Sequence, residues 1–284
     1  MKYVKEIAFF SVVTILLAVV FLHFALPGKE DLRPCQNSLN LGDGYMAKSL
    51  LLNQGEFQEK LVNLSEITEK TARISAEKGL FGDYIQAELD KAQKIMPGIV
   101  TIGIFDSQGI CTAMSPLTHN ITGWDLSETP VVSSMNEEMV PQMTGLFALS
   151  EGGYAASVNY PVFSNDKKYT GFVSLTFDPY TLFNEPASDF MNNTEYQVMI
   201  AQKDGVVLYD TDINEIGKET FNNPMYDEFP EVLEFAKAYS DSFSGEFEYS
   251  YLDKTLSKNV DKKAIWTTIG LHGEEWRLIS IGEL

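Results

Sequence analysis

The sequence predicts an α+β fold in which two similar units follow one another, each an antiparallel sheet flanked by helices. Apolar residues recur at helical spacing between residues 44 and 96. Aromatic and polar residues alternate from Phe247 to Tyr251, which is typical of an antiparallel sheet with one wet face. An apolar strand, a turn and a glycine occur at 102–109 and again at 198–205, and this repeat indicates two tandem units.

The chain begins with a segment long and apolar enough to cross a membrane. As a helix, residues 7–26 span about 30 Å, the thickness of a hydrocarbon core. Lys2 and Lys5 precede this segment, so the positive-inside rule places residues 1–6 in the cytoplasm and the body of the chain outside. We therefore expect a single-pass anchor in the cell membrane and a juxtamembrane linker at 27–40. A cleaved signal peptide is the alternative, although the residues after the apolar run supply a poor cleavage site.

The first unit is expected to begin with helix over residues 44–96, broken near Gly79 to Gly82 and stopped by Pro97-Gly98. A hairpin, a short helix capped by Ser127 and two further strands follow. The expected strands are 99–105, a return strand from Ile110, 154–163 and 169–177.

The second unit is expected to repeat this order, with Phe183 to Glu195 linking it to the first. After the repeated hairpin and Gly217, the expected elements are a helix at 230–240 and strands at 243–252, 263–269 and 276–281.

Composition excludes several classes of function. The chain has 21 Lys and Arg against 40 Asp and Glu, a net charge of −19, whereas a nucleic-acid-binding protein needs a basic face. A hydrophobic content of 44% with 12% aromatic residues is that of a folded globular protein. We therefore expect a folded, acidic body that binds no nucleic acid.

Six short motifs follow one another along the chain. They are Ile104-Phe105-Asp106-Ser107-Gln108-Gly109, Gly123-Trp124-Asp125-Leu126-Ser127, Tyr160-Pro161-Val162-Phe163, Gly171-Phe172-Val173-Ser174-Leu175, the segment 204–210 and Ile216-Gly217-Lys218. In order and spacing, residues 40 to 284 resemble the double Cache (dCache) family, tandem PAS-like sensor modules found outside the membrane in chemoreceptors and histidine kinases. The resemblance implies a helical segment at 41–96, a membrane-distal ligand-binding Cache module at 97–183 and a membrane-proximal Cache module at 184–284.

The sequence departs from the amino-acid-binding members of that family. Where those members carry an arginine, aromatic residues and an aspartate, this chain has Thr129, Val131 with Val132, and Thr176. The arginine would grip a ligand carboxylate and the aspartate would pair with its ammonium group. We therefore expect a neutral or weakly polar ligand.

We expect the ligand site in the distal module. Trp124, Tyr154 and Tyr160 are candidates for its aromatic walls, because binding pockets combine apolar walls with a few polar groups. The full set of predicted ligand-binding residues is Trp124, Asp125, Thr129, Val132, Tyr154, Tyr160 and Thr176. The second unit is expected to lack such a cavity, since the acidic segment 218–231 offers no comparable cluster of aromatic and hydroxyl groups.

No metal or cofactor is predicted. The three histidines are scattered, and two cysteines, Cys35 and Cys111, exclude a multi-cysteine zinc site. Asp204, Asp210 and Asp212 crowd one hairpin, but turn chemistry explains the Asp-Gly pair there without calcium. The chain contains no nucleophile elbow, zinc-protease, P-loop or dinucleotide motif, and we predict no enzymatic activity.

The leading hypothesis is a membrane-anchored extracytoplasmic sensor or solute-binding protein of double Cache type. It would bind a small molecule in the distal module and signal through a partner protein, since the sequence ends at Leu284 without an output region. The alternatives are a surface structural or interaction protein whose units bind no ligand and, third, an anchored hydrolase.

Overall fold

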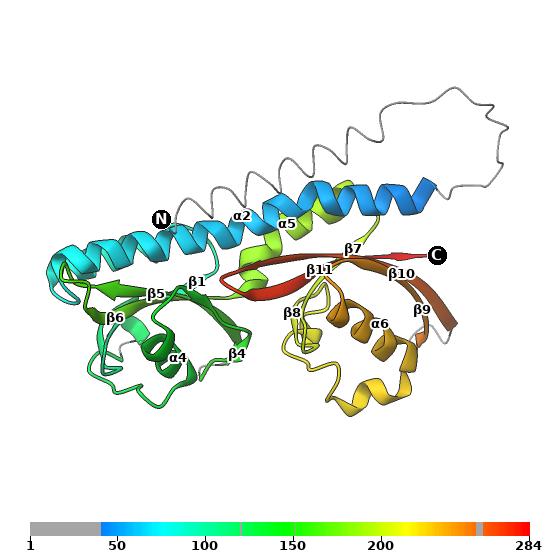
Figure 1. Ribbon diagram of the computed structural model, residues 1–284. Coiled ribbons are helices and arrows are strands. Elements are labelled where there is room, and N and C mark those ends of the chain that lie inside the picture. The colour runs from blue at the N-terminus through cyan, green and yellow to red at the C-terminus, as the bar shows by residue number, and fades with distance from the viewer. Residues whose placement is uncertain (1–40, 120, 151, 254–257) are drawn as a thin grey trace, which may run out of the picture. The chain divides into compact units, whose positions relative to one another are not determined.

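The computed structural model describes residues 41–119, 121–150, 152–253 and 258–284 (Figure 1). The predicted anchor at 7–26 and linker at 27–40 lie outside the described residues. Within the described ranges, none of the helices combines the length and the apolar character that a membrane crossing requires.

The helical segment consists of two helices with the predicted break between them. Helix α2 (Leu41–Lys78) is followed by α3 (Asp83–Ala92). Gly79 and Gly82 between them have φ angles of 97° and 109°, a left-handed conformation that glycine adopts without strain. The break therefore follows from the two glycines that the sequence places there.

One face of α2 carries both apolar and hydroxyl side chains, and all of them are buried. Thr68, Thr71 and Ser75 each donate a hydrogen bond to the carbonyl oxygen four residues earlier, at 2.7, 2.8 and 2.9 Å. Buried polar groups require such partners, so the burial of these hydroxyl groups costs little free energy of folding.

The first sheet is antiparallel, with the order β2-β1-β6-β5-β3, and β4 pairs with β5. Helix α4 (Pro130–Glu138) and the short 3₁₀ helix η1 (Leu117–His119) lie between β2 and β3 in the chain. The strands are β1 (Ile99–Asp106), β2 (Cys111–Ser115), β3 (Gln142–Met143), β4 (Phe147–Ala148), β5 (Tyr154–Phe163) and β6 (Tyr169–Phe177).

The second sheet is also antiparallel, with the order β8-β7-β11-β10-β9, which repeats the β2-β1-β6-β5 path of the first. Its helices are α6 (Pro230–Asp241) and the 3₁₀ helices η2 (Ile213–Glu215) and η3 (Pro224–Glu228). The strands are β7 (Gln197–Gln202), β8 (Val207–Tyr209), β9 (Gly245–Asp253), β10 (Lys258–Leu271) and β11 (Glu274–Glu283). Two tandem antiparallel sheets flanked by helices confirm the predicted fold class.

The segment predicted as a link between the units is a helix, α5 (Pro179–Asn193). Asp178 caps it, because its carboxylate accepts hydrogen bonds from the backbone N–H groups of Tyr180 and Thr181. Pro179 occupies the first helical position, where a missing N–H costs nothing. The prediction that Ser127 caps the short helix α4 is wrong. This helix starts after Thr129, two residues beyond Ser127, and no side chain caps it.

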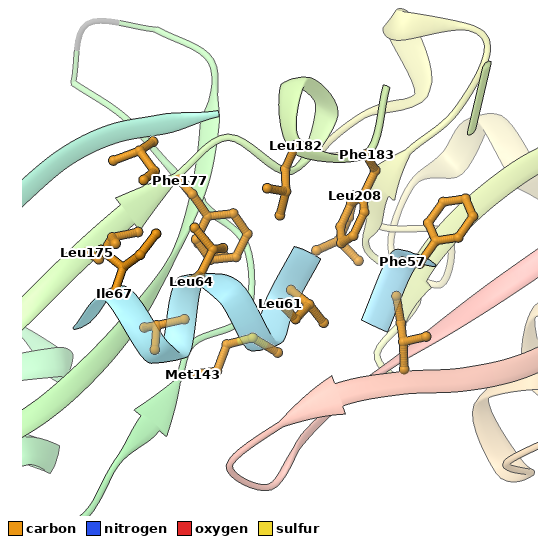
Figure 2. Packing of buried hydrophobic residues seen from close by; sticks show 14 of the residues in the cluster. Phe57, Leu61, Leu64, Ile67, Met143, Leu175, Phe177, Leu182, Phe183 and Leu208 are labelled. Carbon is orange, nitrogen blue, oxygen red and sulfur yellow. The ribbon is translucent and has the colours of Figure 1, made fainter. Parts of the chain in front are cut away.

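A single buried apolar cluster runs along α2 and includes residues of both sheets and of α5. In Figure 2, Leu61 and Leu64 of α2 lie among Leu175 and Phe177 of the first sheet and Leu182 of α5. Phe57 of α2 packs on Phe183, with ring centroids 5.8 Å apart, and Leu208 of β8 belongs to the same cluster (Figure 2). Trp276 of β11 is a further member of this cluster. The two sheets are separate, as expected for two tandem units, and they share this apolar core.

Candidate functional site

The first sheet has two faces of different chemistry. The face toward α2 is apolar and contributes Val158 and Val162 of β5 and Leu175 of β6 to the shared core. Side chains alternate between faces along a strand, so the residues between these point to the opposite face. That face also carries Phe105 and Phe172, which pack under Val132 and Met135 of α4.

Small uncharged residues form two rows across the face toward α4. Ser157, Thr176 and Thr101 lie side by side on β5, β6 and β1, and Asn159, Ser174 and Gly103 form the adjacent row. We call these six residues the polar strip. None of them is charged, and none is larger than asparagine, so the strip is a low, hydrogen-bonding floor beside the apolar cluster under α4.

Asn159 is the most unusual member of the polar strip. Its side chain is fully buried, with 0% exposure, and its Nδ2 donates a hydrogen bond to Ser157 Oγ at 3.0 Å. Its Oδ1 is buried and accepts no hydrogen bond from the described residues. A buried acceptor without a hydrogen bond costs about 1 to 3 kcal/mol, so this oxygen is a candidate contact for a bound group.

The loop after β3 borders the strip. Thr144 Oγ1 accepts a hydrogen bond from the backbone N–H of Ser157 at 2.9 Å and lies 3.4 Å from Ser157 Oγ. Two residues later, the backbone N–H of Leu146 donates to Gln202 Oε1 of β7 in the second sheet. The floor of the candidate site is therefore connected to the second sheet through one short loop.

The structure brings two predicted site residues to this face of the sheet. Thr176 belongs to the polar strip, and Val132 of α4 is 2% exposed in the apolar cluster beside it. Three others lie on the segment that leads into α4. Trp124 is 60% exposed, and its backbone carbonyl accepts a hydrogen bond from Cys111 N at 3.0 Å.

The other two residues of that segment have local roles. Asp125 is exposed, and hydrogen bonds from Ser127 lower the pKa of its carboxyl group. Thr129 Oγ1 donates to the carbonyl of Leu126 at 2.8 Å. These contacts shape the loop before α4 and leave both side chains at the edge of the site.

The structure does not bring Tyr160 and Tyr154 into this site. Tyr160 lies on the face toward α2, where its hydroxyl is 2.8 Å from Ser65 Oγ and its ring meets His272 edge-on at 5.3 Å. Tyr154, at the start of β5, packs its ring on the backbone of Gly217, where even a Cβ atom would come within 2.0 Å of Tyr154 Cζ. Tyr160 occupies a position of β5 whose side chain faces α2 and not α4. Tyr154 packs against the second module.

Five residues of the polar strip were not predicted. Thr101 and Gly103 lie on β1, and Ser157, Asn159 and Ser174 lie on β5 and β6. The signal for the last three was the alternation of β5 and β6, in which these small polar residues take every second position between Val158, Tyr160 and Val173. The register that aligns Ser157 with Thr176 appears only in the folded sheet.

The expectation that the second unit lacks a cavity is wrong. A cavity of about 410 Å³ lies between the second sheet and α6, lined by aromatic residues and carboxylates. The aromatic walls come mainly from η3, α6 and β9, and the carboxylates come from residues 210–215, which follow β8 and include η2. These segments lie far apart in the sequence, so no short stretch of sequence shows the combination.

The thiol of Cys111 is unreactive at neutral pH. Cys111 is buried, and this burial raises the pKa of its thiol to about 11, so it stays protonated at neutral pH. Within the described ranges, no three His, Cys, Asp or Glu side chains form a group suited to a metal ion.

Residues 60–179 match the family described as HK/GC/chemotaxis protein-like, sensor domain. No curated protein matches the chain.

Several solved structures share the fold. The extracellular ligand binding receptor from Desulfohalobium retbaense DSM5692 is 22% identical with a TM-score of 0.69, and the match covers 84% of this chain and 40% of that one. The ligand-binding domain of the Pseudomonas aeruginosa PAO1 amino acid chemoreceptor PctC, in complex with GABA, is 13% identical with a TM-score of 0.61, covering 84% and 98% of the two chains. That of the Pseudomonas fluorescens chemoreceptor CtaA, in complex with L-alanine, is 16% identical with a TM-score of 0.62, covering 85% and 96%.

The matched family and these structures are sensor and ligand-binding domains rather than enzymes. Residues 60–179 are thus similar to a sensor-domain family, and the described residues have the fold of a double Cache sensor domain.

Proposed function

We propose that this protein is a membrane-anchored extracytoplasmic sensor that binds an uncharged polar small molecule on the polar strip of its first module. Residues 7–26 form the anchor in this proposal, and protease added to intact cells should then remove the body of the chain. A partner protein receives the signal. The sensor-domain family match and the fold support this class of function.

The observation that carries the proposal is the buried Oδ1 of Asn159, which accepts no hydrogen bond within the described part of the chain. A ligand N–H or O–H group above the strip would satisfy it. Ser174 and Thr176 on the adjacent strand supply hydroxyl groups that donate or accept, as a small polar ligand requires. The apolar cluster of α4 supplies a neighbouring surface for the ligand's carbon skeleton.

The chemistry of the strip favours an uncharged ligand. GABA and L-alanine, both amino acids, occupy two of the structurally similar domains. A free amino acid carries a carboxylate and an ammonium group, and buried charges need a paired partner. The six residues of the polar strip include no side chain of either charge.

Contacts of β5 give a route by which binding is transmitted. Tyr160 follows Asn159 directly and reaches the other face of the sheet, where it contacts Ser65 of α2. Ser65 Oγ also lies 2.9 Å from Nε2 of His272, at the tip of the β10–β11 hairpin. A ligand that shifts β5 therefore acts on α2 and on the second sheet through one hydrogen-bonded group of three side chains.

The test is a ligand screen by thermal shift on the full chain purified in a nonionic detergent. The panel contains uncharged polyols, amides and ureas together with amino acids. At 100 times its dissociation constant a ligand stabilises by about 2.7 kcal/mol, which raises the Tm by about 5 to 10 °C for a domain of this size. We expect shifts from uncharged compounds.

Shifts from amino acids alone would contradict the choice of ligand class. The absence of a shift from every compound would contradict the sensing function and favour an interaction protein whose modules bind no ligand.

A further inference from the structure

The second module contains a cavity of about 410 Å³ between the face of its sheet and the segments η3 and α6. Its walls come from β7, β8, β9, β10, β11 and α6, which belong to this module alone. The volume lies within the range of about 300 to 1,000 Å³ that small-molecule sites occupy. The cavity is therefore large enough for a small organic ligand and independent of the polar strip.

Aromatic side chains form much of the cavity wall. Phe235 of α6 stacks on Tyr249 of β9 with ring centroids 4.9 Å apart, and Tyr251 lies beside Tyr249 at 6.5 Å. Phe229 meets Tyr251 edge-on at 6.5 Å, and the buried Tyr226 closes the side toward η3. Aromatic faces carry partial negative charge and attract cations that have little hydration to lose.

Three carboxylates line the same cavity. An ion pair with Lys218 already stabilises the charge of Glu215, and hydrogen bonds from Asn214 lower the pKa of Asp212. Glu215 accepts a hydrogen bond from the Tyr226 hydroxyl, and its Oε1 lies 2.6 Å from Lys218 Nζ. Asp212 Oδ1 accepts hydrogen bonds from the backbone and side-chain N–H groups of Asn214, at 3.0 and 2.7 Å.

Asp210 is the third carboxylate, and the groups that donate hydrogen bonds to it are neutral. Its Oδ1 accepts hydrogen bonds from Asp212 N at 2.8 Å and Thr211 Oγ1 at 3.3 Å. No lysine or arginine of the described part of the chain forms an ion pair with it. Burial raises the pKa of Asp210 to about 6, which shows that the protein itself supplies little compensation for its charge.

One ammonium group lines the cavity, that of Lys262, and it has its own partner. Lys262 Nζ lies 3.1 Å from Oε1 of Glu283. An anionic ligand would face the carboxylates with no cation left to receive it. The charge of the cavity therefore selects against anions and leaves Asp210 as the position for a positive charge.

We propose that this cavity is a second ligand site, which holds a small organic cation of the alkylated ammonium class against Asp210 and the aromatic side chains of α6 and β9. The site is independent of the function proposed for the first module.

The test is calorimetric titration of the full chain, in a nonionic detergent, with choline and with its neutral carbon counterpart, 3,3-dimethylbutan-1-ol. We expect choline to bind with a stoichiometry of one and the alcohol to bind at least tenfold more weakly, because the two differ mainly in charge. Asp210→Asn should weaken choline binding roughly tenfold or more, as expected for loss of a desolvated charged partner. Tyr251→Leu should also weaken it, by removing aromatic surface.

Controls separate this site from others. Asp166→Asn removes a carboxylate from an exposed turn of the first module and should leave choline affinity unchanged. Asn159→Leu, which alters the polar strip, should also leave it unchanged, so this proposal and the proposed function fail separately. Equal affinity for choline and the alcohol, unchanged affinity in a folded Asp210→Asn variant, or no choline binding at millimolar concentration would each overturn the proposal.

Discussion

Asp210 shows how a single side chain in a cavity wall can lower the stability of a protein. Burial, the largest cause, raises the pKa of its carboxyl group from 3.8 to about 6, and the charge of Glu215 adds to the effect. The folded protein therefore holds a proton that the unfolded chain has released between these pH values. Its contribution to stability is fully present below pH 3.8 and is lost as the pH rises through about 6.

We therefore predict that Asp210→Asn stabilises the ligand-free protein at pH 7 by roughly 2 kcal/mol and has little effect near pH 4, because asparagine has no charge to desolvate. Denaturant unfolding of both proteins across this pH range measures the difference. Asp166→Asn, at an exposed turn, is the matched control and should show no such trend. A variant that is less stable than the wild type at pH 7 would contradict the prediction.

Residue type alone predicted only some of the side chains at the candidate site of the first module. Thr176 and Val132 were expected and lie at the face toward α4. Tyr160 was chosen because aromatic rings line pockets, but it shares strand parity with Val158 and faces α2. Periodicity separates the two faces of a strand without saying which one a helix covers. Asn159 was missed because its orphaned oxygen is a property of the folded sheet.

At the scale of elements, α2 joins the two sheets. Its apolar residues belong to one buried cluster that also contains residues of β6, α5 and β11. Gln58 strengthens this junction, since its Nε2 donates to the carbonyl of Gly270 at 2.9 Å and its Oε1 accepts from Gly270 N at 3.0 Å. The helix and its break at Gly79 were predictable from apolar spacing and glycine. Its simultaneous contact with two sheets was not, because spacing identifies a buried face and not what covers it.

We predict that Leu64→Ala, which opens a cavity at a position with 0% exposure, destabilises the protein by about 2 to 5 kcal/mol. Because the core is shared, hydrogen exchange should show the loss in β6 and in β11 together. Leu52→Ala on the same helix, at a position with 71% exposure, is the control and should change stability little. A loss confined to one sheet would contradict the shared core.

At the scale of the whole molecule, the sequence repeat predicted two tandem antiparallel sheets, and both sheets have the same strand path. A repeated hairpin followed by similar elements leads to similar strand pairing, so the presence of two similar sheets could be predicted from the sequence pattern alone. The cavity of the second module could not be predicted from the sequence pattern, because its lining residues are spread along the chain from Gln197 to Ile281. The two modules thus share a topology but present different chemistry, neutral in the first and acidic in the second.

The most direct test of the sensing function is calorimetric titration of the wild type and of Asn159→Leu with the uncharged compound that gives the largest thermal shift. Leucine resembles asparagine in shape, so the variant removes the orphaned acceptor while keeping the fold. We predict one binding site in the wild type and at least a tenfold loss of affinity in the variant, as for loss of a buried hydrogen bond worth about 1.4 kcal/mol or more. Asn165→Leu, in the exposed turn between β5 and β6, should bind as the wild type does. Unchanged affinity in a folded Asn159→Leu protein would contradict a ligand site on the polar strip.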